Sequence, residues 1–124
     1  MTDYSKITAL YSRLSVGDED RDGGESNSIQ NQKIFLENYA RGQHLTNIRH
    51  YIDDDESGRF FDRSAYSRMM DDVEAGKVNC IVTKDLSRFG REHVMMDYYL
   101  EFLFPEKRVR YIAVAENEDT EKGL

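Results

Sequence analysis

The sequence contains one cysteine, no long apolar run and no excess of basic residues, and each shortage excludes a class of protein. A lone Cys80 cannot support a disulfide framework, and its apolar neighbours indicate a buried thiol in a reducing compartment. No apolar stretch approaches the about 20 residues that cross a bilayer, and residues 1–4 contain no signal-peptide core. We therefore expect a cytoplasmic location and no membrane partner.

The charge balance restricts binding to nucleic acid. Lys and Arg number 17 against 24 Asp and Glu, which gives a net charge of −7. Proteins bind DNA largely by neutralising phosphates, so any DNA contact of this chain must be local, or a separate DNA-binding region must lie outside it. The polar ending, residues 116–124, favours the second alternative, and we expect the chain to be part of a longer protein.

The order of apolar segments predicts one α/β domain with a mostly parallel sheet of about four strands and flanking helices in three layers. Strands are expected at residues 7–11, 48–52, 78–82 and 109–114. Helices are expected from Ser26 or Ser28 to a stop at Gly42, from Arg63 to Gly76, and from about residue 92 to 104, where Pro105 ends the helix. The last helix has an apolar stripe, expected to serve the core and an interface, made of Val94, Met95, Tyr98, Tyr99, Phe102 and Leu103.

Three polar segments follow the predicted strands, and the carboxyl ends of parallel strands meet at one edge of a sheet, where active sites of such folds gather. Arg13 and Ser15 lie two apart after the first strand, so alternation places both side chains on one face. A serine needs a base or an electropositive surrounding to attack, and no His-Asp pattern accompanies Ser15. Guanidinium matches phosphate oxygens, which indicates phosphoryl transfer. The alternative is an ion pair between Arg13 and Asp54, with Ser15 opening a loop.

The other two segments are also open to more than one interpretation. In Arg88-Phe-Gly-Arg91 the glycine lets a phosphate approach closely, although a solvated helix start has the same composition. The acids at 53–56 are able to hold a divalent cation, accept a phosphoryl group, orient the arginines, or form a solvated turn. His44, His50 and His93 have no Cys or Glu at zinc-ligand spacing, so no structural metal is expected.

Several of these motifs occur together in an order and spacing that resemble one known family. They are Tyr11-x-Arg13-x-Ser15, Ser28-Ile-Gln-Asn-Gln32, Asp54-x-x-Ser57-Gly58, Asp62-Arg63 and Leu86-Ser-Arg88-Phe-Gly-Arg91. Over about residues 5–115 the chain resembles the catalytic domain of the serine recombinases, the resolvase/invertase family. Residues 24–32, the segment from Lys84 to Arg91, and Phe104-Pro-Glu-Lys look like the large serine recombinases of conjugative and mobilisable transposons.

The resemblance implies a site-specific recombinase that acts on double-stranded DNA as a dimer and tetramer, with no metal and no cofactor. Ser15 would attack the scissile phosphodiester, form a 5′-phosphoserine link and release a 3′-hydroxyl before strand exchange and religation. The family pattern implies that Arg13, Arg88 and Arg91 contact the scissile phosphate, that Arg63 assists, and that Gln32 and Asp54 organise the site. The chain stops before the family's oligomerisation helix and DNA-binding region, so weak or no recombination is expected of it alone.

The chain departs from the family pattern at one position. Ser87 stands where resolvases have an aspartate before the first arginine, and Asp85 lies two positions earlier, so it cannot inherit that role. The proton-transfer group therefore stays unassigned. Tyr11 is expected to pack or hydrogen-bond near Arg13, because a phenol with a pKa of about 10 is a poor base at neutral pH.

Two functions of other classes compete with the recombinase. A receiver-like phospho-acceptor domain would explain the acids at 53–56 and Lys84 but leaves Arg13, Ser15, Arg88 and Arg91 without a task. A catalytically silent dimerisation module would use the stripe between Tyr98 and Leu103.

Overall fold

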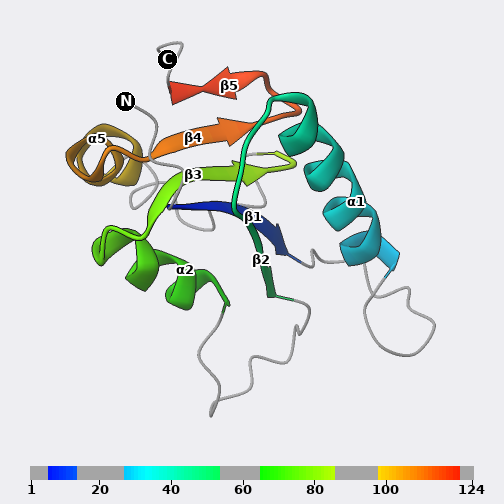
Figure 1. The fold of residues 1–124 in the computed structure, drawn as a ribbon, viewed down its shortest axis with the longest axis horizontal. Coiled ribbons are helices and arrows are strands. Elements are labelled where there is room, and N and C mark those ends of the chain that lie inside the picture. The colour runs from blue at the N-terminus through cyan, green and yellow to red at the C-terminus, as the bar shows by residue number, and fades with distance from the viewer. Residues whose placement is uncertain (1–5, 14–26, 54–64, 86–97, 121–124) are drawn as a thin grey trace.

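The computed structural model describes residues 6–13, 27–53, 65–85 and 98–120, which form a sheet with helices on both faces (Figure 1). The elements in chain order are β1 (Ile7–Arg13), α1 (Asn27–Gly42), β2 (Ile48–Asp53), α2 (Ala65–Glu74), β3 (Val78–Thr83), η1 (Tyr99–Leu103), α5 (Phe104–Lys107), β4 (Arg110–Ala113) and β5 (Glu118–Asp119). The predicted α/β class with a mostly parallel sheet is confirmed.

The strands lie in the order β2-β1-β3-β4-β5, and the first four are parallel. Because β1 lies between β2 and β3, its first six residues are buried, which accounts for their mainly apolar character. The fifth strand, β5, pairs antiparallel with β4 and was not predicted, so the sheet has one strand more than expected.

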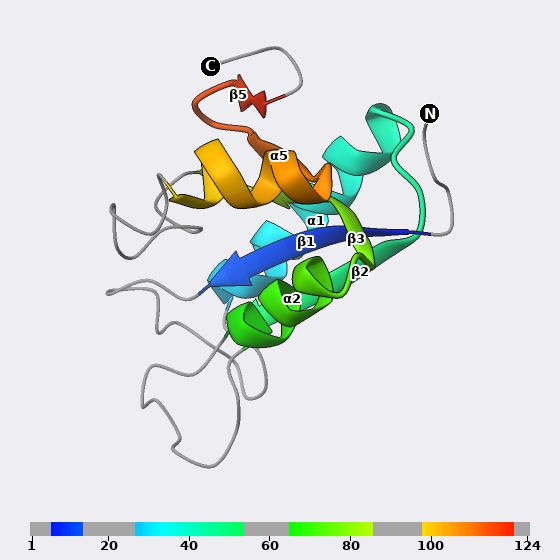
Figure 2. The same ribbon diagram turned by 90° about the vertical axis from the view of Figure 1, so that its left-hand side faces the viewer.

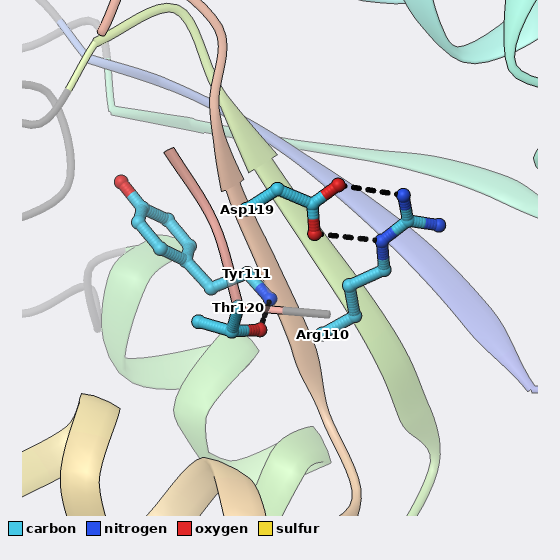
Figure 3. Close-up of polar contacts among 4 residues, drawn as sticks. All are labelled: Arg110, Tyr111, Asp119 and Thr120. Atoms are coloured by element: carbon cyan, nitrogen blue, oxygen red, sulfur yellow. Dashed lines mark hydrogen bonds and ion pairs between the residues drawn. The ribbon is translucent and has the colours of Figure 1, made fainter. Parts of the chain in front are cut away.

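Side chains hold β5 against β4 (Figure 3). Arg110 donates two hydrogen bonds to Asp119, from Nε at 3.0 Å and from Nη2 at 2.7 Å. The main-chain N–H of Tyr111 donates to Oγ1 of Thr120 at 2.9 Å. A ladder of two residues is weak by itself, so this bidentate ion pair defines the edge of the sheet.

Helices lie on both faces of the sheet, as two perpendicular views show (Figures 1 and 2), and each face has its own hydrophobic core. α1 covers one face, and α2, η1 and α5 cover the other. The core under α1 contains Leu10, Leu36, Ala40, Cys80, Val82 and Ile112, so the predicted burial of Cys80 is confirmed. The core under α2 and α5 contains Tyr11, Met69, Val73, Ile81, Phe104 and Tyr111, among others.

The ends of α1 and α2 match the predictions at Gly42 and Gly76, although only Gly76 has a left-handed conformation. Gly76 has φ 77°, a left-handed conformation that favours glycine, and it ends α2 as predicted. α1 also has Gly42 as its last residue, but the left-handed residue is His44, with φ 60°. The N–H of Leu45 donates to the carbonyl of Ala40 and thereby caps the last turn of α1.

The prediction of one helix ended by Pro105 is wrong. η1 is a π-helical turn, and α5 follows it with Pro105 in its first turn, where the missing N–H of proline has no intrahelical partner to lose. α5 continues to Lys107 and is followed by left-handed Arg108, with φ 57°.

The predicted apolar stripe is only partly buried. Tyr98 is 48% exposed and Phe102 is 61% exposed, whereas Leu103 is buried and Tyr99 is partly buried. The other two residues of the stripe, Val94 and Met95, lie outside the described residues. Across the described ranges, no helix has both the length and the apolar character that a membrane span requires.

Candidate active site

The structure describes two of the seven predicted site residues, Arg13 and Gln32. The other five, Ser15, Asp54, Arg63, Arg88 and Arg91, lie outside the described residues, as does Ser87. The described part of the site consists of the strand and helix ends that adjoin these positions in the chain.

The carboxyl ends of β2, β1 and β3 are neighbours in the sheet. Arg13, the last residue of β1, pairs with Asp53, the last residue of β2. On the other side of β1, Leu10 pairs with Val82, one residue before the end of β3. The segments 14–26, 54–64 and 86–97 each follow one of these ends, which agrees with the prediction that they start from one edge of the sheet.

Gln32 holds the main chain of Arg13 from α1. Its side chain is 1% exposed, and its Nε2 donates to the carbonyl of Arg13 at 3.1 Å. The N–H of Arg13 donates to Oε1 of Gln32 at 3.3 Å. One carboxamide thus pairs with both polar groups of one peptide residue, as a neighbouring strand would. Nε2 also donates to Oγ of Ser28, one turn earlier in α1, at 3.2 Å.

The Gln32 contact fixes the strand end two residues before Ser15. A buried amide that satisfies a main-chain N–H and a main-chain carbonyl is costly to lose, because each group would otherwise be left without that partner. Gln32 therefore holds the main chain of Arg13 in place, and its role in a reaction stays a prediction.

Asp53 joins β2 to the first turn of α2. Its Oδ1 accepts the N–H of Ala65 at 2.7 Å, and its Oδ2 accepts the N–H of Tyr66 at 3.1 Å. The hydroxyl of Tyr11 donates to Oδ2 at 2.7 Å. A carboxylate at the start of a helix satisfies free N–H groups and interacts favourably with the helix dipole.

The sequence prediction gave the organising role to Asp54 and missed Asp53. Asp54 lies outside the described residues, and the contacts that the structure records belong to Asp53. The alternation of side chains along a strand could have pointed to Asp53. Asp53 pairs with Arg13, and Arg13 lies on the same face of the sheet as Tyr11, so Asp53 shares that face.

Tyr11 packs and hydrogen-bonds as predicted. It is fully buried, and its ring lies edge-on to that of Tyr66, with centroids 5.5 Å apart. Its proton is donated to Asp53, the strand partner of Arg13. The hydrogen bond between Tyr11 and Asp53 therefore links the end of β1 to the end of β2.

The contacts of Asp53 bear on the interpretations of the acidic run. Both of its oxygens accept donors from the protein, so this acid joins β2 to α2 and to Tyr11, whereas the acids at 54–56 lie outside the described residues. Within the part of the chain that the structure describes, no group of three His, Cys, Asp or Glu is arranged to hold a metal ion.

Comparisons with known proteins agree with this arrangement. The family model "Resolvase, N terminal domain" matches residues 8–123. The N-terminal catalytic domain of TP901-1 integrase has a similar structure, with a TM-score of 0.74 and 25% identity over 95% of this chain and 84% of that chain. A resolvase family site-specific recombinase from Streptococcus pneumoniae also has a TM-score of 0.74, with 27% identity over 94% of this chain and 77% of that chain.

A more distant structure shares the fold. The C-terminal catalytic domain of ISC1926 TnpA, an IS607-like serine recombinase, has a TM-score of 0.65 and 20% identity over 87% of this chain and 69% of that chain. A search of curated proteins finds no match. Because the family model spans nearly the whole chain and the sheet edge has the expected form, the chain belongs to the resolvase family and is a serine recombinase catalytic domain.

Proposed function

We propose that this domain catalyses site-specific DNA recombination of the transposon type, with Ser15 as the nucleophile. Oγ of Ser15 gives up its proton and attacks the scissile phosphorus, and a bond forms between that oxygen and the 5′-phosphate. The bond from phosphorus to the 3′-oxygen breaks, and the 3′-hydroxyl leaves with a proton. After strand exchange, a 3′-hydroxyl attacks the phosphoserine ester and releases Ser15. One phosphodiester replaces another in each step, so no external energy source is needed.

The proposal rests on two sets of hydrogen bonds that hold the ends of β1 and β2 in place. Gln32 holds both main-chain groups of Arg13, and Asp53 holds the neighbouring strand end to the start of α2. Such rigid support suits a group that must meet a phosphate in one geometry. The strand end precedes Ser15 by two residues.

The arginines supply the electrostatic part of the proposed mechanism. Arg13, Arg88 and Arg91 neutralise the charge that develops on the phosphate oxygens, and Arg63 assists. No metal or cofactor is needed in this scheme, because guanidinium groups supply the positive charge.

Gln32 and Asp53 are positioning residues in this scheme, and the role predicted for Asp54 stays a prediction. Neither Tyr11 nor Asp53 is suited to take the proton of Ser15. The phenol of Tyr11 donates its own proton to Asp53, and Asp53 already accepts three donors.

The proposed partners are double-stranded DNA and further copies of the same protein. With a net charge of −7, the domain itself supplies a local phosphate site, and the region that reads bases lies elsewhere in a longer recombinase. The dimer and tetramer form in that longer protein, in the cytoplasm, and the isolated chain has weak or no recombination activity.

Detection of a covalent protein–DNA adduct tests the proposal. The full recombinase that carries this domain is incubated with a supercoiled plasmid that bears its recombination sites, and the mixture is then denatured. We expect protein on the 5′ ends with the wild type and none with Ser15→Ala. Ser12→Ala is the matched control, because Ser12 is fully buried and its Oγ has no hydrogen-bond partner among the described residues.

Each outcome has a defined meaning. Adduct with the wild type and with Ser12→Ala, but not with Ser15→Ala, supports the proposal. Adduct with Ser15→Ala would show that another group attacks. DNA binding without any adduct would favour a silent dimerisation module, and labelling by acetyl phosphate with Mg²⁺ that hydroxylamine removes would favour a phospho-acceptor.

A further inference from the structure

A directed chain of hydrogen bonds crosses the carboxyl end of β3. Thr83, the last residue of β3, is fully buried, and its Oγ1 donates to the carbonyl of Asp85 at 2.9 Å. The hydroxyl of Tyr111 lies 2.8 Å from the same Oγ1. A threonine hydroxyl has one proton, and a carbonyl only accepts. Because that proton goes to the carbonyl of Asp85, the hydroxyl of Tyr111 must donate to Thr83. The chain of hydrogen bonds therefore runs from Tyr111 through Thr83 to Asp85.

Tyr111 is anchored at the other end of this chain. Its main-chain N–H donates to Thr120, and the ion pair between Arg110 and Asp119 stands beside it on β4 and β5 (Figure 3). Its ring packs against Phe104, with centroids 6.3 Å apart. Burial raises the pKa of Tyr111, so the hydroxyl keeps the proton that it donates.

This hydrogen-bond chain ends where the strand gives way to the arginine segment. The N–H of Ala115 donates to the carbonyl of Lys84 at 2.8 Å, which extends the contact between the β3 and β4 segments to that residue. One residue further along, the carbonyl of Asp85 is held by the side chain of Thr83. Residues 86–97 come next, and they include Arg88 and Arg91.

We propose that Tyr111 and Thr83 are positioning residues that set the path of the chain as it leaves β3 toward Arg88 and Arg91. The proposal rests on the proposed function, because it assumes that these arginines act on the phosphate. Coupled contacts of this kind fix where a short segment starts, and a small misplacement of a catalytic group lowers the rate without weakening binding.

The test needs a control that loses a similar hydrogen bond away from this strand end. Tyr51→Phe provides it, because Tyr51 is 5% exposed and its hydroxyl donates to Asp72 in the second half of α2 at 2.6 Å. Tyr111→Phe keeps the ring and removes the hydroxyl, and Thr83→Val keeps the shape and removes the donor. Thr83→Ser keeps the hydroxyl and serves as the conservative rescue.

Single-turnover adduct formation at saturating DNA measures the catalytic effect in the full recombinase. We expect Tyr111→Phe and Thr83→Val to slow adduct formation about tenfold, the equivalent of one hydrogen bond, with unchanged affinity for DNA. The double variant should be no slower than the slower single variant, because both changes break one chain. Thr83→Ser and Tyr51→Phe should keep the wild-type rate.

Amide hydrogen exchange provides a readout that does not depend on activity. Tyr111→Phe should speed exchange at Ala115, whose N–H donates to the carbonyl of Lys84 beside Asp85, and leave α1 unchanged. Equal rates for Tyr111→Phe and Tyr51→Phe, additive effects in the double variant, or faster exchange spread evenly over the domain would overturn the proposal. A wild type that forms no adduct would overturn the proposed function and the catalytic use of this hydrogen-bond chain, whereas the exchange result would still show whether Tyr111 orders Asp85.

Discussion

The contact between Gln32 and Arg13 makes a strong prediction about stability. Gln32→Ala removes three hydrogen bonds and leaves the N–H and the carbonyl of Arg13 without that partner. The two main-chain contacts are long and Arg13 is half-buried, so each loss is worth about 1 kcal/mol, the lower end of the usual range. The contact with Ser28 and the lost packing of two carbons add about another 1 kcal/mol. We expect Gln32→Ala to lower the free energy of unfolding by about 3 kcal/mol.

Urea unfolding followed by circular dichroism measures this loss. A destabilisation of about 3 kcal/mol lowers the midpoint by about 2 M at an m value of about 1.5 kcal/mol/M, and lowers Tm by about 12 °C in a domain of this size. Gln43→Ala is the matched control, since it is the same substitution at an exposed position directly after α1 and should change the stability by less than about 0.5 kcal/mol. Equal effects at the two positions, or a loss under about 1 kcal/mol at Gln32, would refute the reasoning.

Gln32→Glu separates hydrogen bonding from packing, because it keeps the shape of the side chain. The introduced carboxyl replaces the donor to the carbonyl of Arg13 by an oxygen, and burial raises its pKa in the folded state. A raised pKa means that the folded state binds the proton more tightly. The variant should therefore come closest to the wild type below pH about 4 and lose stability as the pH rises to about 7. A pH-independent difference would contradict a buried carboxyl.

Three further predictions concern other contacts of the described residues. Asp53→Ala should lower the stability by about 2–3 kcal/mol in thermal unfolding, because it removes the cap of α2 and leaves the buried hydroxyl of Tyr11 without this acceptor, and a loss below about 1 kcal/mol would contradict the cap. His44→Gly should raise the stability by about 0.5–1 kcal/mol, because the residue is exposed and left-handed, and a lower Tm would show that its side chain contributes. The hydrogen bond from His50 lowers the pKa of Glu37 below its ordinary 4.5, so the stability difference between the wild type and Glu37→Gln should be present above that pH and shrink in acid; a difference that grows as the pH falls would refute this sign.

The features that follow from local pattern were predictable. Apolar runs located β1 to β4. Gly76 predicted the end of α2, because glycine adopts the positive φ of that position without a steric cost. β5 was missed because Glu118 and Asp119 carry no apolar signal, and what pairs them with β4 is an ion pair with Arg110 across the sheet. The end of α5 was missed because Pro105 was expected to end a helix, whereas a proline fits equally well in the first turn of one.

The candidate site was predictable as a place in the fold and less so as a set of contacts. Parallel strands bring their carboxyl ends together whatever the side chains are, so the edge at Arg13 and Asp53 follows from the topology. The choice between Asp53 and Asp54 depends on which carboxylate meets the first turn of α2, and that contact joins residues twelve and thirteen apart. Motif spacing carries no information on such a contact, whereas the alternation of side chains along a strand does.

Several acidic side chains of this domain bind other groups of the domain, which helps to explain how a protein with a net charge of −7 can act on DNA. Asp53 accepts donors from the start of α2, Asp72 accepts the hydroxyl of Tyr51, and Asp119 accepts both hydrogen bonds of Arg110. These three carboxylates bind groups of the domain itself. Asp53, at the candidate site, faces the N–H groups at the start of α2, and their partial positive charge partly offsets the negative charge of the carboxylate. Arg110 pairs with Asp119 and Arg49 with Asp72, whereas the donors to Asp53 are neutral and leave its formal charge in place. Charges farther from the strand ends are screened over the Debye length of about 8 Å at physiological salt, so nearby groups contribute more to the field there than the net charge does. Under the proposed function, a few arginines at that edge are sufficient to hold one phosphate, while the acidic remainder keeps the domain from binding DNA elsewhere.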